Sequence, residues 1–321
     1  MNALPATADP LGETLYFLRM SGVFYSRCEF SAPWGLALPP IENYLMFHII
    51  IAGDCRLEID GEDARMLRPG DLALVPHGRG HQLRSGPGAQ LIDLWDHPRE
   101  MIGERYEVLR QDGGGEPTTL VCGAVRFDHP VARHLIEMLP RLIVVEAERS
   151  PRMDWTRSTI ELMAAEAGDA RPGGETIITR LADILVIQAI RAWIERDPAA
   201  RSGWLGALRD DQIGRALTLI HRDPARDWTV AELAAEVAMS RSAFAARFNA
   251  LVGEPPMQYL TRWRMQLARV WLEEDGATVG ELAQRLGYGS EAAFSRAFKR
   301  IIGRSPGSVR RGVTGARKQP A

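Results

Sequence analysis

Several common signals are absent from this 321-residue chain. Three cysteines in a chain of this length are too few for the disulfide framework of a small secreted protein. No apolar run approaches the length that spans a bilayer, and residues 1–10 lack the basic and apolar segments of a secretory signal peptide. Nucleophile-elbow, phosphate-loop and catalytic-triad patterns are absent as well. We therefore expect a soluble cytoplasmic protein, without a membrane partner, that is not an enzyme of those classes.

The charges that the chain does carry are unevenly distributed. Residues 1–204 have 21 Arg against 29 Asp and Glu, whereas residues 205–321 have 18 Lys and Arg against 12 Asp and Glu. An acidic front and a basic back indicate that only the back part meets a polyanion. Apolar residues make up 45% and charged residues 25% of the chain, which is typical of globular proteins, and the length suits about two domains.

Residues 1–128 are predicted to be rich in β-strands. Short β-branched runs alternate with Gly, Pro and Asp turns, of which Asp60-Gly61 is the clearest hairpin signal. The runs cover residues 44–52, 56–59, 71–76, 90–95 and 118–127. Closely spaced strands joined by such turns predict a small sandwich or barrel.

Residues 129–204 are predicted to be a helical extension that ends in a linker. Apolar residues recur at helical spacing over 131–139, 153–167 and 176–195. The third helix is so apolar that we expect it to be buried on more than one side. Packing on the barrel and a dimer interface each explain that pattern, and the two explanations are compatible.

Residues 205–312 contain an internal repeat, which predicts an all-helical domain built from two similar units. The sequence Thr229-Val-Ala-Glu-Leu-Ala recurs 49 residues later as Thr278-Val-Gly-Glu-Leu-Ala. Each copy has a capping box, a tight turn to a serine N-cap, and a final glycine followed by a proline. These residues are Thr229, Glu232, Ser240, Gly253 and Pro256 in the first copy, and Thr278, Glu281, Ser290, Gly303 and Pro306 in the second. Two short helices joined by a tight turn form a helix-turn-helix unit, which binds DNA through its second helix.

The outward positions of the second helix in each unit are candidate DNA contacts. A helix that enters the major groove needs small residues for close approach and donors for base edges and phosphates. The candidates are Arg241, Ser242, Ala245, Ala246 and Arg247 in the first unit, and Glu291, Ala292, Ser295, Arg296 and Lys299 in the second. A helix predicted over 257–271 would place both units in successive major grooves, about 34 Å apart. The alternative is a plain helical bundle with a solvated polar face.

With these motifs, residues 210–310 resemble the AraC/XylS family of bacterial transcription regulators. The resemblance rests on the paired motifs, on Tyr259-Leu260 with Arg264, and on the closing Ser305-Pro306-x-x-Val309-Arg310. It implies that base contacts come from the outward positions of both second helices. We expect double-stranded DNA as the partner of this domain, with a homodimer of the chain and RNA polymerase as further partners.

Ala246 departs from the family's pattern, because many relatives carry a base-contacting Arg at that position. The first of the two DNA-binding helices is therefore expected to contact DNA mainly through its backbone and by packing on thymine methyl groups. Arg241 and Arg247 would then contact phosphates.

The front part of the chain resembles the cupin-type sensor domain that occurs in a subset of this family. The stretch Gly70-x5-Pro76-x-Gly78-x-x-His81 fits the second cupin motif. The first motif is present only in part, because Ile50 and Asp54 occupy the places of a His and a Glu. These two changes argue against a standard cupin iron site. Cupin metalloenzyme activity in this domain is the alternative function.

Two histidines and two cysteines are the candidate sensor residues. The cupin match places His48 and His81 inside the barrel, and Cys28 and Cys122 lie in or beside predicted strands of the same barrel. Together the four would form a soft site for Zn or Cu(I), or a thiol pair that senses oxidants. Cys55 is a substitute for Cys122 in such a set.

Three alternatives stay open for these residues. Buried cysteines are commonly inert, and a buried histidine is often only hydrogen-bonded. An organic effector held by His48, His81 and either Trp34 or Trp95 is the second alternative. A domain that dimerises and senses nothing is the third.

The sequence thus predicts an α+β multidomain protein with a cupin-like β-barrel and two helix-turn-helix units. The expected domains are a sensor barrel over 1–128, a helical extension and linker over 129–204, a DNA-binding domain over 205–312 and a flexible tail over 313–321. The predicted function is sequence-specific DNA binding that regulates transcription in response to an effector, a metal or an oxidant. No catalytic residue is assigned.

Overall fold

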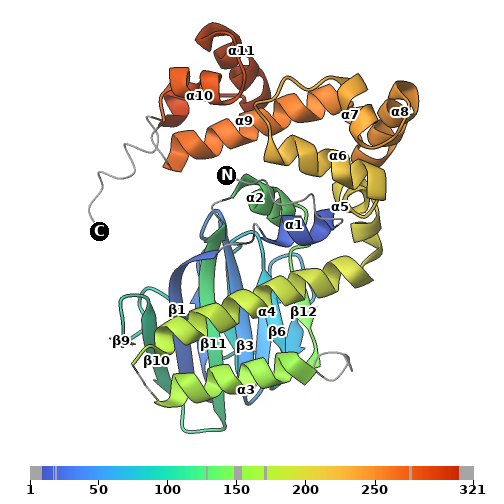
Figure 1. Cartoon of the computed structure of the whole chain (residues 1–321). Coiled ribbons are helices and arrows are strands. Elements are labelled where there is room, and N and C mark those ends of the chain that lie inside the picture. The colour runs from blue at the N-terminus through green and yellow to red at the C-terminus, as the bar shows by residue number, and fades with distance from the viewer. Residues whose placement is uncertain are drawn as a thin grey trace. The chain divides into compact units, whose positions relative to one another are not determined.

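A β-rich part and an all-helical part are both present in the structure, as the sequence predicts (Figure 1). This computed structural model describes residues 9–16, 18, 20–127, 129–147, 154–169, 172–274 and 277–310, so the predicted tail over 313–321 lies outside the described residues. Contacts divide the chain into a β unit, Leu18–Asp128 with Ala132–Glu195, and a helical unit, Met1–Phe17, His129–Val131 and Arg196–Ala321. Within those described ranges, no helix is long and apolar enough to cross a membrane.

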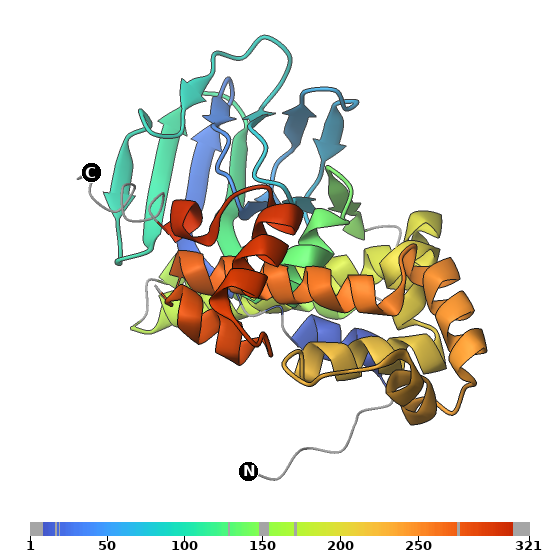
Figure 2. The same ribbon diagram turned by 90° about the horizontal axis from the view of Figure 1, so that it is seen from above.

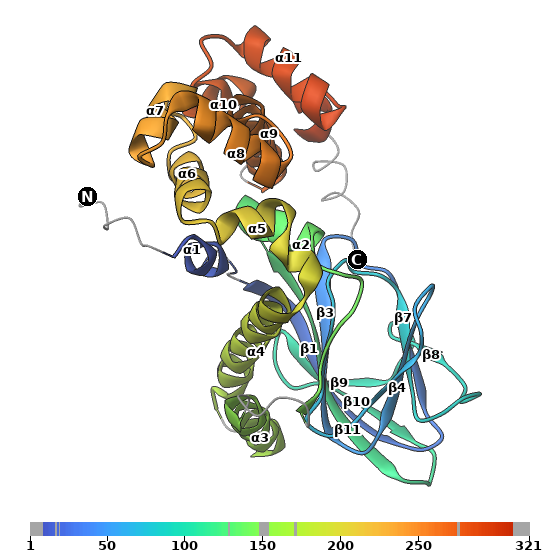
Figure 3. The ribbon, with the colours of Figure 1, turned by 90° about the vertical axis from the view of Figure 1, so that its right-hand side faces the viewer.

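The β unit contains two sheets that face each other (Figure 3). One sheet has seven strands in the order β12-β6-β3-β11-β1-β10-β9, and the other has five in the order β5-β4-β7-β2-β8. The strands are β1 (Met20–Ser31), β2 (Gly35–Leu38), β3 (Tyr44–Ala52), β4 (Cys55–Ile59), β5 (Arg65–Leu67), β6 (Leu72–Val75), β7 (His81–Arg84), β8 (Ile92–Asp93), β9 (Arg99–Met101), β10 (Tyr106–Asp112), β11 (Pro117–Phe127) and β12 (Ile143–Val145). The apolar core draws side chains from both sheets, so the predicted barrel takes the form of a two-sheet sandwich.

Alternation along the central strands decides which side chains face this core. In β3, Met46 and Ile50 belong to the core cluster and His48 lies between them on the same face. The intervening residues of β3 are buried as well, because α3 (Asp154–Asp169) packs against this strand. Burial on both faces explains why β3 is a nearly continuous apolar run in the sequence.

Helices α2 (Pro130–Glu137), α3 and α4 (Gly174–Arg196) lie in the segment predicted to be a helical extension, which also contributes strand β12 to the seven-stranded sheet. α3 and α4 lie across the outer face of the seven-stranded sheet (Figures 1 and 3). One side of α4 is buried, but Ile177 and Ile184 on another side are 41% and 45% exposed, and Leu162 of α3 is 49% exposed. Packing within the unit therefore accounts for only part of the apolar surface of α4, and the dimer interface stays a prediction.

The helical unit combines the C-terminal helices with one helix from near the start of the chain. Its elements are α1 (Pro10–Tyr16), η2 (Pro198–Arg201), α5 (Gly203–Leu208), α6 (Asp211–Arg222), α7 (Val230–Glu236), α8 (Arg241–Val252), α9 (Pro256–Glu274), α10 (Val279–Arg285) and α11 (Glu291–Ile302). α1 packs against α6, where the Glu13 carboxylate accepts hydrogen bonds of 2.5 and 2.9 Å from the guanidinium of Arg222. Residues 196–203, predicted as a linker, are folded and include η2.

The predicted caps are present in both copies of the repeat. Capping boxes join Thr229 to Glu232 and Thr278 to Glu281, so that side chain and backbone satisfy each other at the start of α7 and α10. Serine side chains cap α8 and α11, and a glycine in the left-handed conformation ends each of these helices. Interactions over three or four residues thus set the ends of the four short helices.

Candidate DNA-binding surface and effector pocket

Helix α8 presents a polar face on the surface of the helical unit. Phe244 and Phe248, four residues apart, are fully buried and anchor its other face. All five of the predicted contacts on this helix are exposed or half-buried: Arg241, Ser242, Ala245, Ala246 and Arg247. The helix is therefore open on the side that the sequence predicts.

The guanidinium of Arg247 pairs with the carboxylate of Asp210. Its Nε and NH2 atoms lie 3.1 and 2.5 Å from Oδ2 of Asp210. The other oxygen of Asp210 caps α6 by accepting hydrogen bonds from the amides of Gln212 and Ile213. This geometry favours a structural role for Arg247, which joins α8 to α6, over the expected phosphate contact.

Helix α11 also presents a polar face on the surface, and this face carries both acidic and basic side chains. Phe294 and Phe298 are fully buried. The predicted contacts of this helix are again exposed or half-buried: Glu291, Ala292, Ser295, Arg296 and Lys299. Arg300 is exposed beside Lys299. At the positions equivalent to Ala246 and Asn249 of α8, α11 therefore offers the cationic donors Arg296 and Lys299.

Helix α9 separates α8 from α11, which lie toward its opposite ends (Figures 1 and 2). Its 19 residues make it about 28 Å long, close to the distance of about 34 Å between successive major grooves. The buried hydroxyl of Tyr259 accepts a hydrogen bond of 2.8 Å from Trp204 and lies 2.6 Å from Nε2 of His221. These contacts pack α9 firmly against α5 and α6.

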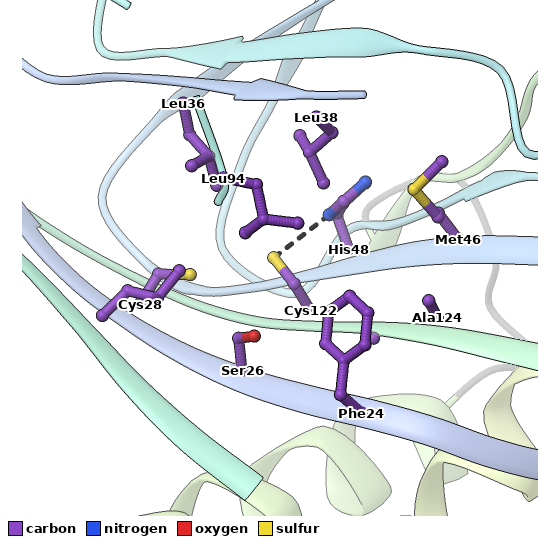
Figure 4. A pocket seen from close by; sticks show the side chains of 12 residues that line it. Phe24, Ser26, Cys28, Leu36, Leu38, Met46, His48, Leu94, Cys122 and Ala124 are labelled. Carbon is purple, nitrogen blue, oxygen red and sulfur yellow. Dashed lines mark hydrogen bonds between the residues drawn. The ribbon is translucent and has the colours of Figure 1, made fainter. Parts of the chain in front are cut away.

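A small pocket, with an enclosed volume of about 10 Å³, lies within the sandwich of the β unit (Figure 4). Strands β1, β3 and β11 of one sheet and β2 of the other contribute to it. Its apolar walls are Phe24, Leu36, Leu38, Met46, Leu94, Leu109 and Ala124, with Gly123, and its polar side chains are Ser26, Cys28, His48 and Cys122. His48 and Cys122 point toward each other across one end of the pocket (Figure 4).

The polar end of the pocket is a chain of hydrogen bonds that continues behind His48. Nδ1 of His81 lies 2.8 Å from the carbonyl oxygen of Arg79, so this nitrogen carries the proton and donates. Nε2 of His81 then accepts from Nε2 of His48 at 2.6 Å. Nδ1 of His48 is left as an acceptor for the thiol of Cys122 at 3.1 Å. One tautomer of each imidazole therefore satisfies the whole chain.

Burial keeps every member of this chain uncharged at neutral pH. It lowers the pKa of His48 well below its ordinary value, with a further contribution from His81, and it lowers the pKa of His81 to about 4. The neighbouring thiol of Cys28, together with burial, raises the pKa of Cys122. Burial also raises the pKa of Cys55. The pocket therefore ends in neutral donors and acceptors.

This geometry does not favour the predicted soft metal site. Cys122 contacts Nδ1 of His48 and His81 contacts Nε2, so the two ligands lie at opposite edges of one ring and do not converge on a point. In the part of the chain that the structure describes, no three His, Cys, Asp or Glu side chains are placed to hold a metal ion. Buried neutral thiols such as that of Cys122 are also poor nucleophiles, which disfavours oxidant sensing.

The remaining sensor candidates lie outside the pocket lining. Cys55 is buried in β4 and does not line the pocket, although it is close enough to Cys122 for the two thiols to interact. Trp34 is fully buried and packs on Phe30 in the core. Trp95 is 56% exposed and makes an edge contact with Phe24, which lines the pocket.

Sequence reasoning missed several lining residues, although a signal for some was available. Phe24 and Ser26 precede Cys28 by four and two positions in β1, so strand alternation places all three on one face. Leu94 falls in the run 90–95 that was predicted as a strand, but β8 ends at Asp93, so strand alternation does not place its side chain.

Comparisons with known proteins agree with this architecture. A family model described as cupin matches residues 9–195, and one described as a helix-turn-helix domain matches residues 233–312. A putative AraC-like transcription regulator of Streptomyces lividans is 36% identical over 310 residues, which cover 95% of this chain and 99% of that protein. The chain belongs to the AraC-like family of transcription regulators.

Two further relatives of this AraC-like regulator match most of the chain and its DNA-binding part, respectively. The transcriptional regulator AlkR of Acinetobacter baylyi is 32% identical over 268 residues, 83% of this chain and 87% of that protein. The DNA-binding domain of AdpA, solved in complex with a target DNA, is 32% identical and covers 33% of this chain and 95% of that one, with a TM-score of 0.31. The two family-model matches and the Streptomyces lividans relative confirm the resemblance to AraC/XylS regulators and the cupin assignment.

Proposed function

We propose that this AraC-like regulator recognises DNA through unequal contributions of its two exposed helices. Arg296 and Lys299 lie on the open face of α11, where a guanidinium suits guanine and an ammonium suits phosphate. Ala245 and Ala246 lie on the open face of α8, where small side chains permit close approach to thymine methyl groups. The exposed basic face of α11 is the observation that carries this proposal.

Selection of duplexes by the full chain, followed by affinity measurements at several salt concentrations, tests the DNA-binding faces. Log affinity is expected to fall linearly with log salt, and Lys299→Ala is expected to reduce the slope by about one. Arg191→Ala is the matched control, because Arg191 is an exposed arginine on α4 of the β unit. Binding that does not depend on salt, or equal effects of the two variants, would contradict the proposal.

The pocket of the β unit suits a small uncharged effector that carries one hydrogen-bonding group. Burial of the effector against the apolar walls contributes about 25 cal/mol per Å² of apolar surface. An ionic group would find only neutral partners at the His48–Cys122 end, and burying an unpaired charge is strongly unfavourable. The enclosed volume of about 10 Å³ has room for about one water molecule, so the lining side chains must move apart when an effector binds. The apolar walls and the neutral polar end support a neutral effector over a metal or an oxidant.

Strand β1 provides a short covalent route from the pocket to the helical unit. β1 supplies Phe24, Ser26 and Cys28 to the pocket and follows α1 closely in the chain, and α1 packs against α6. An effector regulates by this route only if it binds one arrangement of the chain more tightly than the other.

Thermal unfolding of the full chain tests the pocket, with neutral alcohols and phenols compared with matched carboxylates and amines. Only the neutral compounds are expected to raise Tm, by mass action on the folded state. Cys122→Ala should reduce this shift, and Cys55→Ala is the matched control because Cys55 is buried outside the pocket. Zn²⁺, Cu⁺ and hydrogen peroxide are tested in parallel. A response to one of these, and none to the neutral compounds, would contradict the proposal.

A second copy of the chain is the proposed partner of the exposed face on α3 and α4. Leu162, Ile177 and Ile184 form this face, and each is more than 40% exposed. A twofold interface is self-complementary, so an apolar stripe on one copy can pack on the same stripe of the other. A homodimer interface here would remove these apolar side chains from water, which favours association.

A further inference from the structure

Arg264 lies in the middle of α9, the helix that joins the two helix-turn-helix units, and it contacts both of them. Its Nε donates to the carbonyl oxygen of Pro224 at 2.6 Å, and its NH2 group donates to that of Arg226 at 2.9 Å. Both carbonyls lie in the loop between α6 and α7, which leads into the first helix-turn-helix unit. The guanidinium also lies 5.9 Å from the ring centre of Tyr288, in the turn between α10 and α11.

The backbones of the two units also approach each other closely beside this arginine. Gly287 has a φ of +73°, and a Cβ atom there would lie 2.5 Å from the carbonyl oxygen of Ala225. The equivalent position of the first unit is Ala238, with a φ of 54°, so this turn does not by itself require glycine. The contact with Ala225 explains the glycine, because it lets the loop of the first unit lie against the turn of the second.

A guanidinium suits the position of Arg264 better than other cationic side chains. The planar guanidinium donates two N–H groups to two carbonyl oxygens and still lies beside the aromatic ring of Tyr288. The side chain is half-buried, so these acceptors are needed to offset the loss of water. Arg262, on the same helix, instead pairs at 2.6 Å with Glu254, two residues before α9 begins.

We propose that Arg264 is a positioning residue that sets the separation of α8 and α11, and so restricts this regulator to one spacing of DNA half-sites. A connecting helix alone leaves two units free to swivel about its ends, where loop residues absorb the rotation. The contacts of Arg264 and Gly287 bind the units directly to each other. When α8 occupies a major groove, these contacts hold α11 over one position of the duplex. The effective concentration of α11 is then high at a half-site in that position and low at half-sites elsewhere. This inference rests on the proposed DNA contacts of both helices.

The test measures affinities of the full chain for a selected two-part duplex, for each half-site alone, and for duplexes whose half-sites are moved apart or together by one to five base pairs. Wild type is expected to prefer its own spacing by about tenfold or more, and Arg264→Met is expected to reduce that preference to about threefold or less, as for a flexible linkage. Half-site affinities should stay within about twofold of wild type. Arg262→Met is the matched control and should keep the spacing preference.

Each outcome either supports or overturns the role of Arg264. An unchanged spacing preference in Arg264→Met overturns it, and so does an equal loss on two-part and half-site duplexes, which is the signature of a phosphate contact or of general destabilisation. If Arg264→Met does not fold, Tyr288→Ala decides, because it removes the ring beside the guanidinium: relaxed spacing supports the proposal and unchanged spacing overturns it. A wild-type chain that binds no duplex contradicts the DNA-binding faces, whereas half-site binding without a spacing preference contradicts only this inference.

Discussion

Replacement of His81 by glutamine tests the neutral hydrogen-bond chain at the end of the effector pocket. The imidazole of His81 accepts from His48 at 2.6 Å and donates to the carbonyl oxygen of Arg79 at 2.8 Å. A glutamine side chain also has one acceptor and donors, but it takes up no proton in the accessible pH range. The variant therefore keeps hydrogen-bonding capacity at this position and removes one titrating group.

The magnitude follows from the difference in proton affinity between the folded and unfolded states. Burial lowers the pKa of His81 from 6.5 to about 4. At about 1.4 kcal/mol per pH unit, this single group makes the free energy of unfolding about 3 kcal/mol larger above pH 6.5 than below pH 4. The sign follows because the unfolded chain binds the proton first as the pH falls, so stability is lost between pH 6.5 and 4. Between pH 6.5 and 4, the free energy of unfolding of His81→Gln should therefore fall by about 3 kcal/mol less than that of wild type.

The cysteines provide an assay that is specific to the β unit. All three cysteines of the chain, Cys28, Cys55 and Cys122, lie in this unit and are buried, so a thiol reagent labels them only when it unfolds. Urea unfolding is followed by labelling with a disulfide reagent that stays reactive at acid pH, for both proteins from pH 7.5 to 4. Parallel curves of unfolding free energy against pH for wild type and His81→Gln would refute the neutral, buried state of His81.

Single substitutions elsewhere test the basic helix, the repeated turn and the exposed helical face. Arg296→Ala should weaken binding to the selected duplex by about 1–3 kcal/mol and relax specificity at one base pair; an equal loss on all duplexes in a competition assay would make Arg296 a phosphate contact. Ala238→Gly should raise the unfolding free energy in urea by about 0.5–1 kcal/mol, because glycine adopts a φ of 54° without strain, and Gly287→Ala should lower it. Ile184→Glu should convert dimers to monomers in sedimentation, whereas Met101→Glu, at another exposed apolar site, should not; dimers that survive Ile184→Glu would contradict the proposed interface.

Local signals in the sequence were enough to predict the helical repeat and several of the strands. A capping box joins residues three positions apart, and a left-handed glycine ends a helix through its own backbone, so both act wherever the segment lies. Alternation places every second residue of a strand on one face, whereas the expected position of His48 inside the barrel came from the cupin match. In the structure His48 lines the pocket. These interactions need no knowledge of the rest of the fold.

Only the tertiary structure decided which of these residues meet. His48 and His81 are 33 positions apart, and their contact depends on how β3 and β7 are placed in two different sheets. The pairing of Arg247 with Asp210, the docking of α1 on α6 and the contacts of Arg264 with two units likewise join distant segments. Spacing patterns report the periodicity of one segment, whereas contacts between segments depend on strand order and packing, which no single segment encodes.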